Sequence, residues 1–506
     1  MTTKNVSDPA GPEFEHTQEP ITREPIAREP KAARGGLDGF FRISERGSTV
    51  GREVRGGVVT FFAMAYIVLL NPLILGTSPD REGTVLGIPQ VAAVTALTAG
   101  VMCILFGVIA RYPFGIATGL GLNTLVAVTL VGQQGLTWPE AMGLVVIDGL
   151  VIVLLAVSGF RTAVFNAIPD SMKTAMSVGI GMFIALIGLV DAGFVRRVPD
   201  AAMTTVPVQL GFEGSIASWP TLVFVLGLLI CGFMVARSVP GGLFIGIVAT
   251  TVISLIVEHF AGAGSSADDP HGWSLAVPVL PDSLGGVPDL SLVGNVDLVG
   301  AFANVGALAA SLMVFTLVLA NFFDAMGTMT ALGRQGELTD EHGNLPGLKR
   351  ALVVEGFGAV LGGAASSSSN TVYVDSSAGI ADGARTGLAN VVTGLLFLLA
   401  MFFTPLYEIV PIEAAAPVLV VVGALMMMQV GAIDWTRFEV ALPAFLTIVV
   451  MPFTYSIANG IGVGFIAFTV MALFAGKLKD IHWIMWLISA LFVVYFAQGP
   501  LLAALS

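Results

Sequence analysis

Residues 114–128 read FGIATGLGLNTLVAV, and residues 366–379 read SSSSNTVYVDSSAG. Each stretch lies among apolar segments but is short for a membrane span, and each carries Gly or Ser where a helix would have to continue. The second stretch also contains a β-type run at 371–374, directly before Asp375. Non-helical backbone is tolerated at membrane depth only where protein buries it or where it lines a cavity. We therefore expect a short β-strand and a half-helix in each stretch, with both half-helix N-termini facing one cavity.

The composition around these stretches is that of a polytopic membrane protein. Of 506 residues, 55% are hydrophobic and only 11% are charged, whereas a soluble protein carries about 25% charged residues. Apolar runs such as 221–236 and 388–403 approach the ~20 residues that cross a bilayer as a helix, and similar runs recur through most of the chain. The net charge of −12 lies largely in the N-terminal tail and in one loop. It therefore indicates no basic partner, and we expect no nucleic acid to bind.

The apolar runs predict an all-α protein of the lipid bilayer with fourteen transmembrane segments. Residues 1–47 are rich in Pro, Glu, Arg and Gly and predict a disordered cytoplasmic tail. The stretch Trp483–Ala504 is either interfacial or an additional helix. The fourteen segments lie near 57–76, 90–110, 114–131, 139–159, 168–190, 219–237 and 240–259, and then near 302–332, 350–365, 367–383, 387–405, 411–430, 438–457 and 459–476.

The basic residues test this segment count. With the N-terminus in the cytoplasm, only Arg81, Arg196 and Arg197 of the 23 Lys and Arg residues fall outside. The loop at 261–298 carries several Asp and no Lys or Arg. This is the positive-inside asymmetry, and a missed or invented helix would scramble it downstream. The pattern predicts a multi-pass protein of the cell (inner) membrane with its N- and C-termini in the cytoplasm.

An internal repeat lies beneath the segments. Ile168-Pro169 opens the fifth segment, and Val410-Pro411 opens the twelfth, about 240 residues later. The sequence GGLFIGIV at 241–248 is echoed by NGIGVGFI at 459–466 at a similar offset. Seven helices per repeat is an odd number, so the two copies must have opposite membrane orientations. Inverted repeats place a substrate site near the bilayer midplane, at interrupted helices in corresponding positions of the two halves.

Two acidic residues inside predicted segments are candidates for substrate binding and for proton coupling. Asp324 lies in the eighth segment, where an ionised Asp costs roughly 2.5–3.5 kcal/mol on insertion scales and therefore needs a partner or a function. Asp375 lies at the expected start of the half-helix in the tenth segment, beside Ser376, where it could instead be an N-cap. The five His residues fall in the tail, in loops or at segment ends. We therefore expect Asp324 and Asp375, rather than His, to carry the proton.

Polar uncharged residues complete the candidate substrate site. Asn123 occupies the matching place in the third segment, and an amide supplies both a donor and an acceptor to a heterocyclic edge. Asn321 lies one helical turn before Asp324, and Thr328 lies one turn after it, so all three share a helix face. Asn123 could instead be a helix-packing amide, and Thr328 could bond to its own helix backbone.

Two further acids have alternative interpretations. Asp148 in the fourth segment could serve in a conformational relay or be structural. Glu355 is about one turn from Arg350, which favours a structural pair that snorkels to the cytoplasmic surface. The chain contains no GxxxxGK[ST] loop and no Cys/His cluster with metal-ligand spacing. We therefore expect no ATP-driven transport, no metal and no cofactor other than the proton as coupling ion.

Several long motifs resemble one known family. They run in order between about Thr49 and Gly476, and they resemble the AzgA-type hypoxanthine/guanine/adenine permeases of the nucleobase–ascorbate transporter superfamily. The motifs are TFFAMAYIVLLNPLIL (60–75), GLGLN (119–123), FFDAMGT (322–328), NTVYVDSSAGIADGARTGL (370–388) and PLYEIVPIEAAAPVLVVVGALM (405–426).

The resemblance implies a fourteen-helix fold of two inverted seven-helix repeats and proton-coupled uptake of purine nucleobases, commonly by homodimers. A core domain (48–160 and 300–406) would move against a gate domain (161–260 and 407–476). The tail (1–47), an external linker (261–299) and a C-terminal apolar segment (477–506) would complete the chain. Family members often have an acid where this chain has Asn321, and typically Glu where it has Asp375, which leaves room for a different purine preference.

The predicted mechanism places the base between the third and tenth half-helices, against the eighth helix. Asp375 would accept N–H groups from one edge of the purine, while Asn123 and half-helix N–H groups would bind its carbonyl and ring nitrogens. Asp324 would be protonated before the cargo enters and release its proton inward.

Four alternatives stay open at this point. The same fold could carry another nucleobase, such as xanthine or uracil, or a small anion, which the two acids would repel. An intramembrane aspartyl protease would need a GxGD-like motif, which is absent around both acids. A non-transporting receptor would need a signalling domain, for which the short C-terminal tail gives no room.

Overall fold

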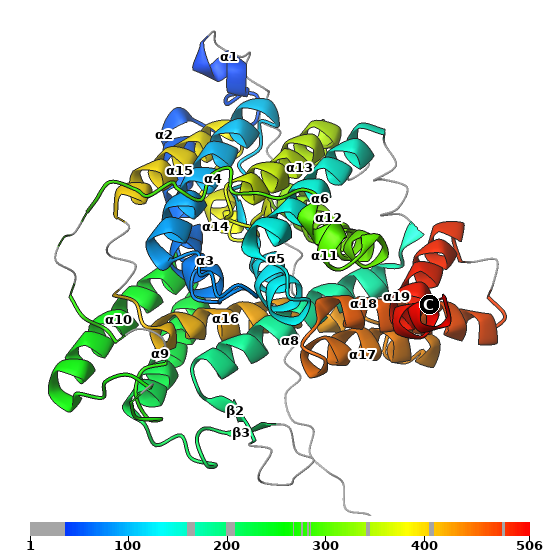
Figure 1. Cartoon of the computed structure of the whole chain (residues 1–506). Coiled ribbons are helices and arrows are strands. Elements are labelled where there is room, and N and C mark those ends of the chain that lie inside the picture. The colour runs from blue at the N-terminus through cyan, green and yellow to red at the C-terminus, as the bar shows by residue number, and fades with distance from the viewer. Residues whose placement is uncertain are drawn as a thin grey trace, which may run out of the picture.

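The computed structural model describes residues 36–158, 167–198, 208–266, 268–274, 277–280, 283, 285–340, 345–403, 409–477 and 481–505. It is almost wholly helical, and its helices form two groups (Figure 1). One group consists of the elements between residues 50 and 158 and those between 300 and 400. The other consists of the elements between 170 and 261 and those between 412 and 474. Each group therefore combines elements from both halves of the sequence.

The first group begins with two helices that are separated by a break at Ala65–Tyr66. Its first-half members are α2 (Val50–Met64), α3 (Ile67–Leu75), α4 (Ile88–Ile109), β1 (Ile116–Thr118), α5 (Leu120–Thr124), the π-helix η1 (Leu125–Gln133) and α6 (Trp138–Ser158). Its second-half members are α11 (Gly300–Asn304), α12 (Ala307–Gln335), α13 (Leu348–Ala364), β4 (Asn370–Val372), α14 (Ser376–Ala381) and α15 (Gly387–Ala400).

The second group contains the helices of the predicted gate. They are α8 (Asp170–Asp191), α9 (Trp219–Ala236), α10 (Gly242–Ala261), α16 (Ile412–Met427), η4 (Met428–Ala432), α17 (Phe438–Phe453) and α18 (Ile457–Phe474). A hairpin of β2 (Val195–Arg197) and β3 (Val208–Leu210) follows α8, and α19 (Trp483–Leu505) packs against α18. Pro169 and Pro411 stand directly before α8 and α16, where proline is compatible with a helix start.

Pairs of helices from opposite halves hold each group together. In the first group, α13 packs on α6 and α15 packs on α4, while in the second group α16 packs on α8. Small residues allow these close approaches. A Cβ atom at Gly387 of α15 would overlap the carbonyl oxygen of Gly107 in α4. Such small-residue contacts are how membrane helices pack without a hydrophobic driving force between them.

The strands β1 and β4 cross the first group as an antiparallel pair. Ile116 lies opposite Val372, and Thr118 lies opposite Asn370. Every residue of both strands is buried. Non-helical chain is possible within the apolar interior because the pairing satisfies the backbone groups on the facing edges, and buried side chains satisfy others.

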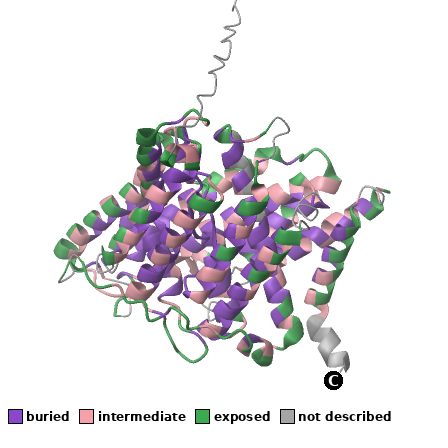
Figure 2. Cartoon of the chain, turned by 90° about the horizontal axis from the view of Figure 1, so that it is seen from above, coloured by how far each residue is buried: buried purple, intermediate pink, exposed green. Residues whose placement is uncertain are grey.

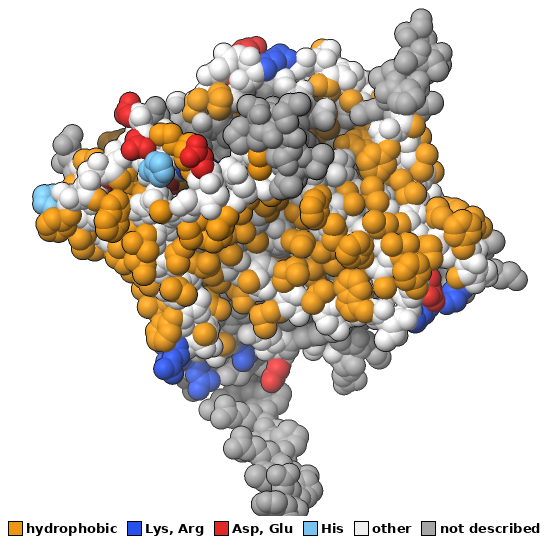
Figure 3. Space-filling model, turned by 90° about the horizontal axis from the view of Figure 1, so that it is seen from below, with side chains coloured by type: hydrophobic (Ala, Val, Ile, Leu, Met, Phe, Trp, Pro, Cys, Tyr) orange, Lys and Arg blue, Asp and Glu red, His pale blue; other side chains and the backbone are white. Residues whose placement is uncertain are grey.

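The outer surface is apolar in the way a membrane protein requires. Among the described residues, eight helices are long and apolar enough to cross a bilayer, and further helices of 10–17 residues are also apolar. Buried residues fill the centre of the molecule, while exposed residues lie on the outer faces of peripheral helices (Figure 2). Many exposed side chains are large and hydrophobic, such as Leu154 (68% exposed) and Leu229 (65%). Figure 3 shows hydrophobic side chains across the middle of one face, with Lys and Arg along its lower edge.

Two expectations about the first residues need correction. Residues 36–47 do not belong to a disordered tail, because they form α1 (Leu37–Phe41) and a turn that buries Phe41 and Ile43. Arg46 holds this turn in place by donating to the carbonyl oxygens of Arg111 (2.7 Å) and Arg385 (2.9 Å). The first membrane helix also begins at Val50, after Thr49 as N-cap, rather than near residue 57. Residues 1–35 of the predicted tail lie outside the described residues.

The third and tenth segments are broken helices, each with a strand ahead of a short helix. The number of fourteen segments and the inverted symmetry of the two repeats stay predictions. The division into a core and a gate domain that move against each other also stays a prediction.

Candidate functional site

The strand pair is the platform of the candidate site, and buried side chains fix it in place. The Cys103 thiol group of α4 bonds to both the backbone N–H and the carbonyl oxygen of Ile116. Asn390 of α15 donates to the carbonyl oxygen of Phe114 (2.7 Å). Beyond the strands, the Gly119 N–H donates to the Ser369 carbonyl oxygen (3.0 Å). Both broken segments are therefore tied to each other and to continuous helices.

The four serines before β4 form a tight, fully buried turn. Ser366 and Ser368 have φ angles of 59° and 71°, a left-handed conformation that is uncommon outside glycine. The Ser366 hydroxyl donates to the Leu292 carbonyl oxygen (3.3 Å), and the Ser367 hydroxyl lies 3.0 Å from that of Thr98. Backbone held in such conformations by its surroundings is concentrated at functional sites.

Asp375 lies where β4 turns into α14, and its carboxylate does not cap that helix. The residue occupies the N-cap position of α14, but its side chain makes no capping hydrogen bond. Its Oδ2 atom instead accepts a hydrogen bond of 3.0 Å from the Tyr66 hydroxyl group, at the break between α2 and α3. The interpretation of Asp375 as a capping residue is therefore wrong, and its carboxylate lies among side chains of the first helix group.

Asp324 of α12 lies beside the strand pair. Its carboxylate is adjacent to the Thr371 hydroxyl group of β4, although the two do not form a hydrogen bond of ordinary geometry. Tyr373 is close enough to interact electrostatically with both Asp324 and Asp375. Thr371 and Asp375 are four residues apart, so their Cα atoms are separated by at most about 14 Å. The structure thus brings the two predicted acids to the same short segment.

Asn123 of α5 is the polar residue of the candidate site that argues most for a bound ligand. It is fully buried, and neither its Oδ1 nor its Nδ2 atom has a hydrogen-bond partner among the described residues. The Thr118 hydroxyl group is also buried without a partner there, and the Thr371 hydroxyl group has only the adjacent Asp324 carboxylate beside it. Buried polar groups in proteins are nearly always hydrogen-bonded, so these groups beside the strand pair are candidates for binding a ligand.

Asn321 belongs to a network behind the strands. Its amide nitrogen donates to the Ser369 hydroxyl (2.9 Å) and to the Asp148 carboxylate (3.3 Å), and all three residues are fully buried. The donor capacity of Asn321 is therefore used within the protein, while its Oδ1 atom has no partner among the described residues. Asp148, for which a relay and a structural role were both open, supports α12 through Asn321.

Ser376 and Thr328 are the remaining predicted site residues, next to Asp375 and one turn from Asp324, respectively. The Ser376 hydroxyl accepts from the Gly115 N–H (2.8 Å) and donates to the Tyr373 carbonyl oxygen (2.7 Å). The hydroxyl group therefore links the residues next to β1 and β4. We predict that Ser376 holds these two backbone segments together and does not donate to a substrate. Thr328 is half-buried on α12, one turn beyond Asp324.

Glu355 corrects an expectation. Arg350 is exposed, whereas Glu355 of α13 is fully buried and lies close enough to Asp324 for their charges to repel. Glu355 therefore faces the interior beside the candidate site and does not snorkel to the cytoplasmic surface. Among the residues that the structure describes, no three His, Cys, Asp or Glu side chains gather in a way that could hold a metal ion.

Residues 51–463 match the model of a protein family described as the Permease family. The chain belongs to this family. It is therefore a multi-pass transporter rather than an enzyme, and the intramembrane protease alternative is excluded.

The sequences of two relatives align with nearly the whole length of this permease. The guanine/hypoxanthine permease PbuG of Bacillus subtilis is 38% identical over 460 residues, which are 90% of this chain and 98% of that protein. The adenine permease AdeP of Escherichia coli is 33% identical over 465 residues, covering 92% of this chain and 96% of that one. The resemblance to AzgA-type purine permeases is confirmed by these relatives.

Solved structures show the same fold at low identity. The transmembrane domain of the cyanobacterial bicarbonate transporter BicA has a TM-score of 0.58 at 15% identity, covering 81% of this permease and 97% of that chain. The murine anion transporter Slc26a9 in its inward-facing state has a TM-score of 0.55 at 12% identity. The match covers 84% of this permease and 68% of that chain. These likenesses concern the fold alone.

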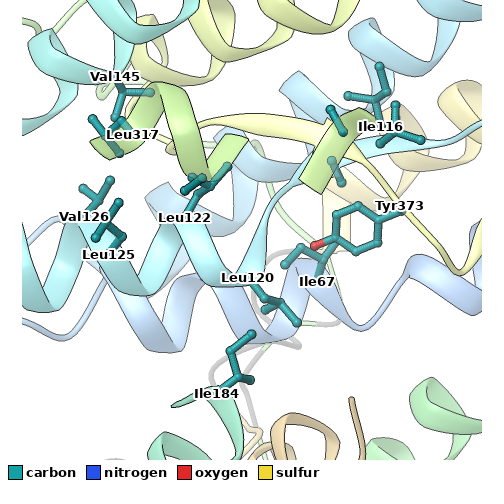
Figure 4. Close-up of a cluster of buried hydrophobic side chains, with 14 of the residues drawn as sticks. Ile67, Ile116, Leu120, Leu122, Leu125, Val126, Val145, Ile184, Leu317 and Tyr373 are labelled. Atoms are coloured by element: carbon teal, nitrogen blue, oxygen red, sulfur yellow. The ribbon is translucent and has the colours of Figure 1, made fainter. Parts of the chain in front are cut away.

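A helix of the second group covers the candidate site of the permease. Ile184 of α8 points towards Leu120 at the start of α5 (Figure 4). Gly121 is so close to the same helix that a Cβ atom there would lie 3.0 Å from Ile180 Cγ2. This apolar contact lies at the boundary between the two helix groups, close to Asn123 in the chain.

Sequence reasoning missed the two tyrosines of the site. Tyr66 donates to Asp375, and Tyr373 donates from its hydroxyl group to the Thr118 carbonyl oxygen. Both residues lie inside the family motifs, at 60–75 and 370–388. A phenol within an apolar stretch needs a hydrogen-bond partner when buried, and this was the signal that could have found them.

Proposed function

We propose that this permease carries purine nucleobases into the cell together with a proton, by alternating access. The observation that carries the proposal is the fully buried Asn123 amide, which lacks a partner among the described residues. It follows strand β1 closely in the chain, and the carboxylates of Asp324 and Asp375 lie near Tyr373, directly after β4. The names of the relatives support a purine as the cargo. A neutral heterocycle offers both N–H donors and acceptor atoms, which matches an amide, hydroxyl groups and carboxylates.

The base lies between α5 and α14 and against α12 in this proposal. Asp375 accepts an N–H group of the purine, and Asn123 binds a carbonyl oxygen or a ring nitrogen. The hydroxyl groups of Thr118 and Thr371 add hydrogen bonds along the strands. Each of these groups is positioned by backbone that other residues hold, so little reorganisation is needed when the base binds.

Asp324 is the residue that we assign to proton coupling, with Asp375 as the second titrating group. Asp324 lies near the buried Glu355, so two carboxylates are close together in an apolar interior. A proton that enters with the base and leaves inward supplies roughly 2.3 kcal/mol per 100 mV of membrane potential.

A small anion as cargo has support from the fold but not from the site. The structural neighbours include anion carriers, whereas Asp324, Glu355 and Asp375 lie at or beside the predicted binding position. Acidic groups there would repel an anion, and we therefore favour the neutral base. Xanthine and uracil stay alternatives within the nucleobase class.

The decisive test is uptake of radiolabelled hypoxanthine by cells that lack their own purine transporters. We expect uptake above the external concentration, competition by unlabelled guanine or adenine, and collapse of accumulation with a protonophore. Sulfate and bicarbonate in excess are the controls for the anion alternative. Uptake that sulfate inhibits and guanine does not would contradict the proposal.

We also propose a cytoplasmic location for both termini and assembly as a homodimer in the cell membrane. Cysteine accessibility at positions in the tail before residue 36 tests the first point, and the mass of the purified protein in detergent tests the second.

A further inference from the structure

Tyr66 is a buried side chain at the edge of the candidate site. It is 1% exposed, and its hydroxyl group donates to Asp375 Oδ2 over 3.0 Å. A phenol buried in an apolar interior strongly favours having such a partner. Two residues from different halves of the chain are thereby joined across 309 positions.

The backbone and the neighbouring ring fix the position of the Tyr66 hydroxyl group. Tyr66 lies where the helix breaks between α2 and α3, so its side chain leaves the helix axis at a point set by both helices. Its ring packs against that of Tyr373, with centroids 6.4 Å apart. Because the Tyr373 hydroxyl group donates to Thr118, it does not compete for Asp375.

Within the described residues, Tyr66 is the side chain that donates to the Asp375 carboxylate, beside a contact with the backbone of Asp375 itself. Its own helix does not hold it, because the N-cap position of α14 carries no capping bond. Asp375 is half-buried, so its second oxygen can turn towards a ligand. Without the Tyr66 hydroxyl group, the side chain would be distributed over other χ1 rotamers.

We infer that Tyr66 is a positioning residue for substrate binding: its hydroxyl group holds the Asp375 carboxylate in the orientation that accepts an N–H group of the transported base. This inference rests on the proposed function, since it concerns the same site. It assigns a role to the break in the first membrane helix, which sequence reasoning did not connect with the substrate. Tyr66 itself touches Asp375 rather than the base.

The test compares Tyr66→Phe with wild type in the full-length protein, by uptake of radiolabelled hypoxanthine in transport-deficient cells. Phenylalanine keeps the ring and removes the hydroxyl group alone. Loss of one hydrogen bond to a charged group corresponds to about a tenfold loss in affinity. We therefore expect KM for hypoxanthine to rise about tenfold, with the maximal rate per transporter within about twofold of wild type.

Tyr112→Phe is the matched control. Tyr112 is also 1% exposed, and its hydroxyl group donates to the Pro346 carbonyl oxygen, away from the acids. The control should lower the thermal unfolding midpoint at least as much as Tyr66→Phe does, with KM unchanged. An unchanged KM in Tyr66→Phe, or an equal rise in both variants, would overturn the inference.

A second comparison asks whether Tyr66 acts through Asp375. In an Asp375→Asn background, Tyr66→Phe should change KM less than twofold, because no charged acceptor is left to be held. Thermal-shift titration of the purified proteins with hypoxanthine gives the same comparison if uptake by Asp375→Asn is too slow. A full tenfold effect in that background would show that Tyr66 acts independently.

Failure of the positioning role and failure of the proposed function are distinguishable. If wild-type protein takes up no purine, the proposed function is wrong. If wild type takes up hypoxanthine and Tyr66→Phe does so with wild-type KM, the function stands and the positioning role is wrong.

Discussion

Asn123 is a residue at which ligand binding and packing make opposite demands. A buried amide that lacks partners costs the folded protein a desolvation penalty of about 1–3 kcal/mol. Neither polar atom of the Asn123 side chain has a partner in the described part of the chain. An apolar side chain of similar volume would stabilise the fold better, which is why we propose that this amide serves the transported base.

We predict that Asn123→Leu abolishes most hypoxanthine uptake, by at least about tenfold, while the unfolding midpoint of the purified protein stays equal or rises. The comparison variant is Asn390→Leu, which should lower the midpoint because the Phe114 carbonyl oxygen loses its 2.7 Å donor. Uptake and differential scanning fluorimetry together provide both readouts. A lowered midpoint with intact uptake in Asn123→Leu would assign this amide to packing.

The proposed coupling role of Asp324 can be tested by separating accumulation from binding. Asp324→Asn keeps the size and polarity of the side chain but cannot release a proton. We predict that uphill uptake of hypoxanthine is lost, whereas exchange of internal for external hypoxanthine persists at no less than about a tenth of the wild-type rate. The measurement is counterflow in cells or proteoliposomes preloaded with unlabelled base. Intact accumulation by Asp324→Asn would remove this residue from the coupling step.

At the scale of elements, the β1–β4 pair depends on close backbone approaches. A Cβ atom at Gly362 of α13 would overlap the carbonyl oxygen of Ser368, in the turn that leads into β4. This neighbour is backbone in a buried turn and cannot move as a flexible side chain could. The position therefore demands glycine for reasons of space rather than backbone conformation.

Gly362→Ala should consequently reduce transport at least about tenfold and lower the unfolding midpoint. Gly232→Ala is the control, because a Cβ atom at that position in α9 meets nothing within 4 Å. In a helix interior, Ala is favoured over Gly by up to about 1 kcal/mol, so the control should be neutral or slightly stabilising. Equal transport rates and equal unfolding midpoints for the two variants would show that the turn before β4 tolerates an extra methyl group.

The elements also show what could be predicted from the sequence and why the rest could not. The breaks in the third and tenth segments were predictable because glycine and serine replace the expected apolar run. The helix α1 was not predictable, since five residues do not form a stable helix alone and Arg46 docks the segment on loops distant in sequence. The π-helix η1 leaves no compositional signal, because it differs from an α-helix in hydrogen-bond spacing rather than residue type. The place of Asp375 between β4 and α14 was predictable from the sequence, whereas its hydrogen bond with Tyr66 depends on tertiary contact.

For the whole molecule, the proposed transport cycle requires the two helix groups to move apart over the site. Residues Gly121 of α5 and Ile180 of α8 face each other across this boundary, with 3.0 Å between an ideal Cβ atom and Ile180 Cγ2. Because Cγ2 is one bond from the Ile180 Cβ atom, the two Cβ atoms are at most about 4.5 Å apart, which is compatible with the Cβ–Cβ separation of about 3.5–4.5 Å in a disulfide.

We predict that Gly121→Cys/Ile180→Cys protein loses transport when oxidised and recovers it when reduced. Single-cysteine variants are the controls, and the native Cys103 and Cys231 are buried and free. Uptake is measured before and after oxidation, with crosslinking followed by mass spectrometry. Transport by fully crosslinked protein at the rate of the reduced form would contradict relative motion at this boundary.

The strand pair has a further consequence for how the protein is made. Tyr373 and Thr118 are bonded across 255 positions, and β1 is synthesised long before β4. Lipid offers no hydrogen bonds, so the early strand carries unsatisfied backbone groups until the later one inserts beside it. A nascent chain that stops before Asn370 therefore presents an unfinished edge to membrane chaperones and proteases. If the proposed site is correct, a place for the cargo exists only once β4 has paired with β1.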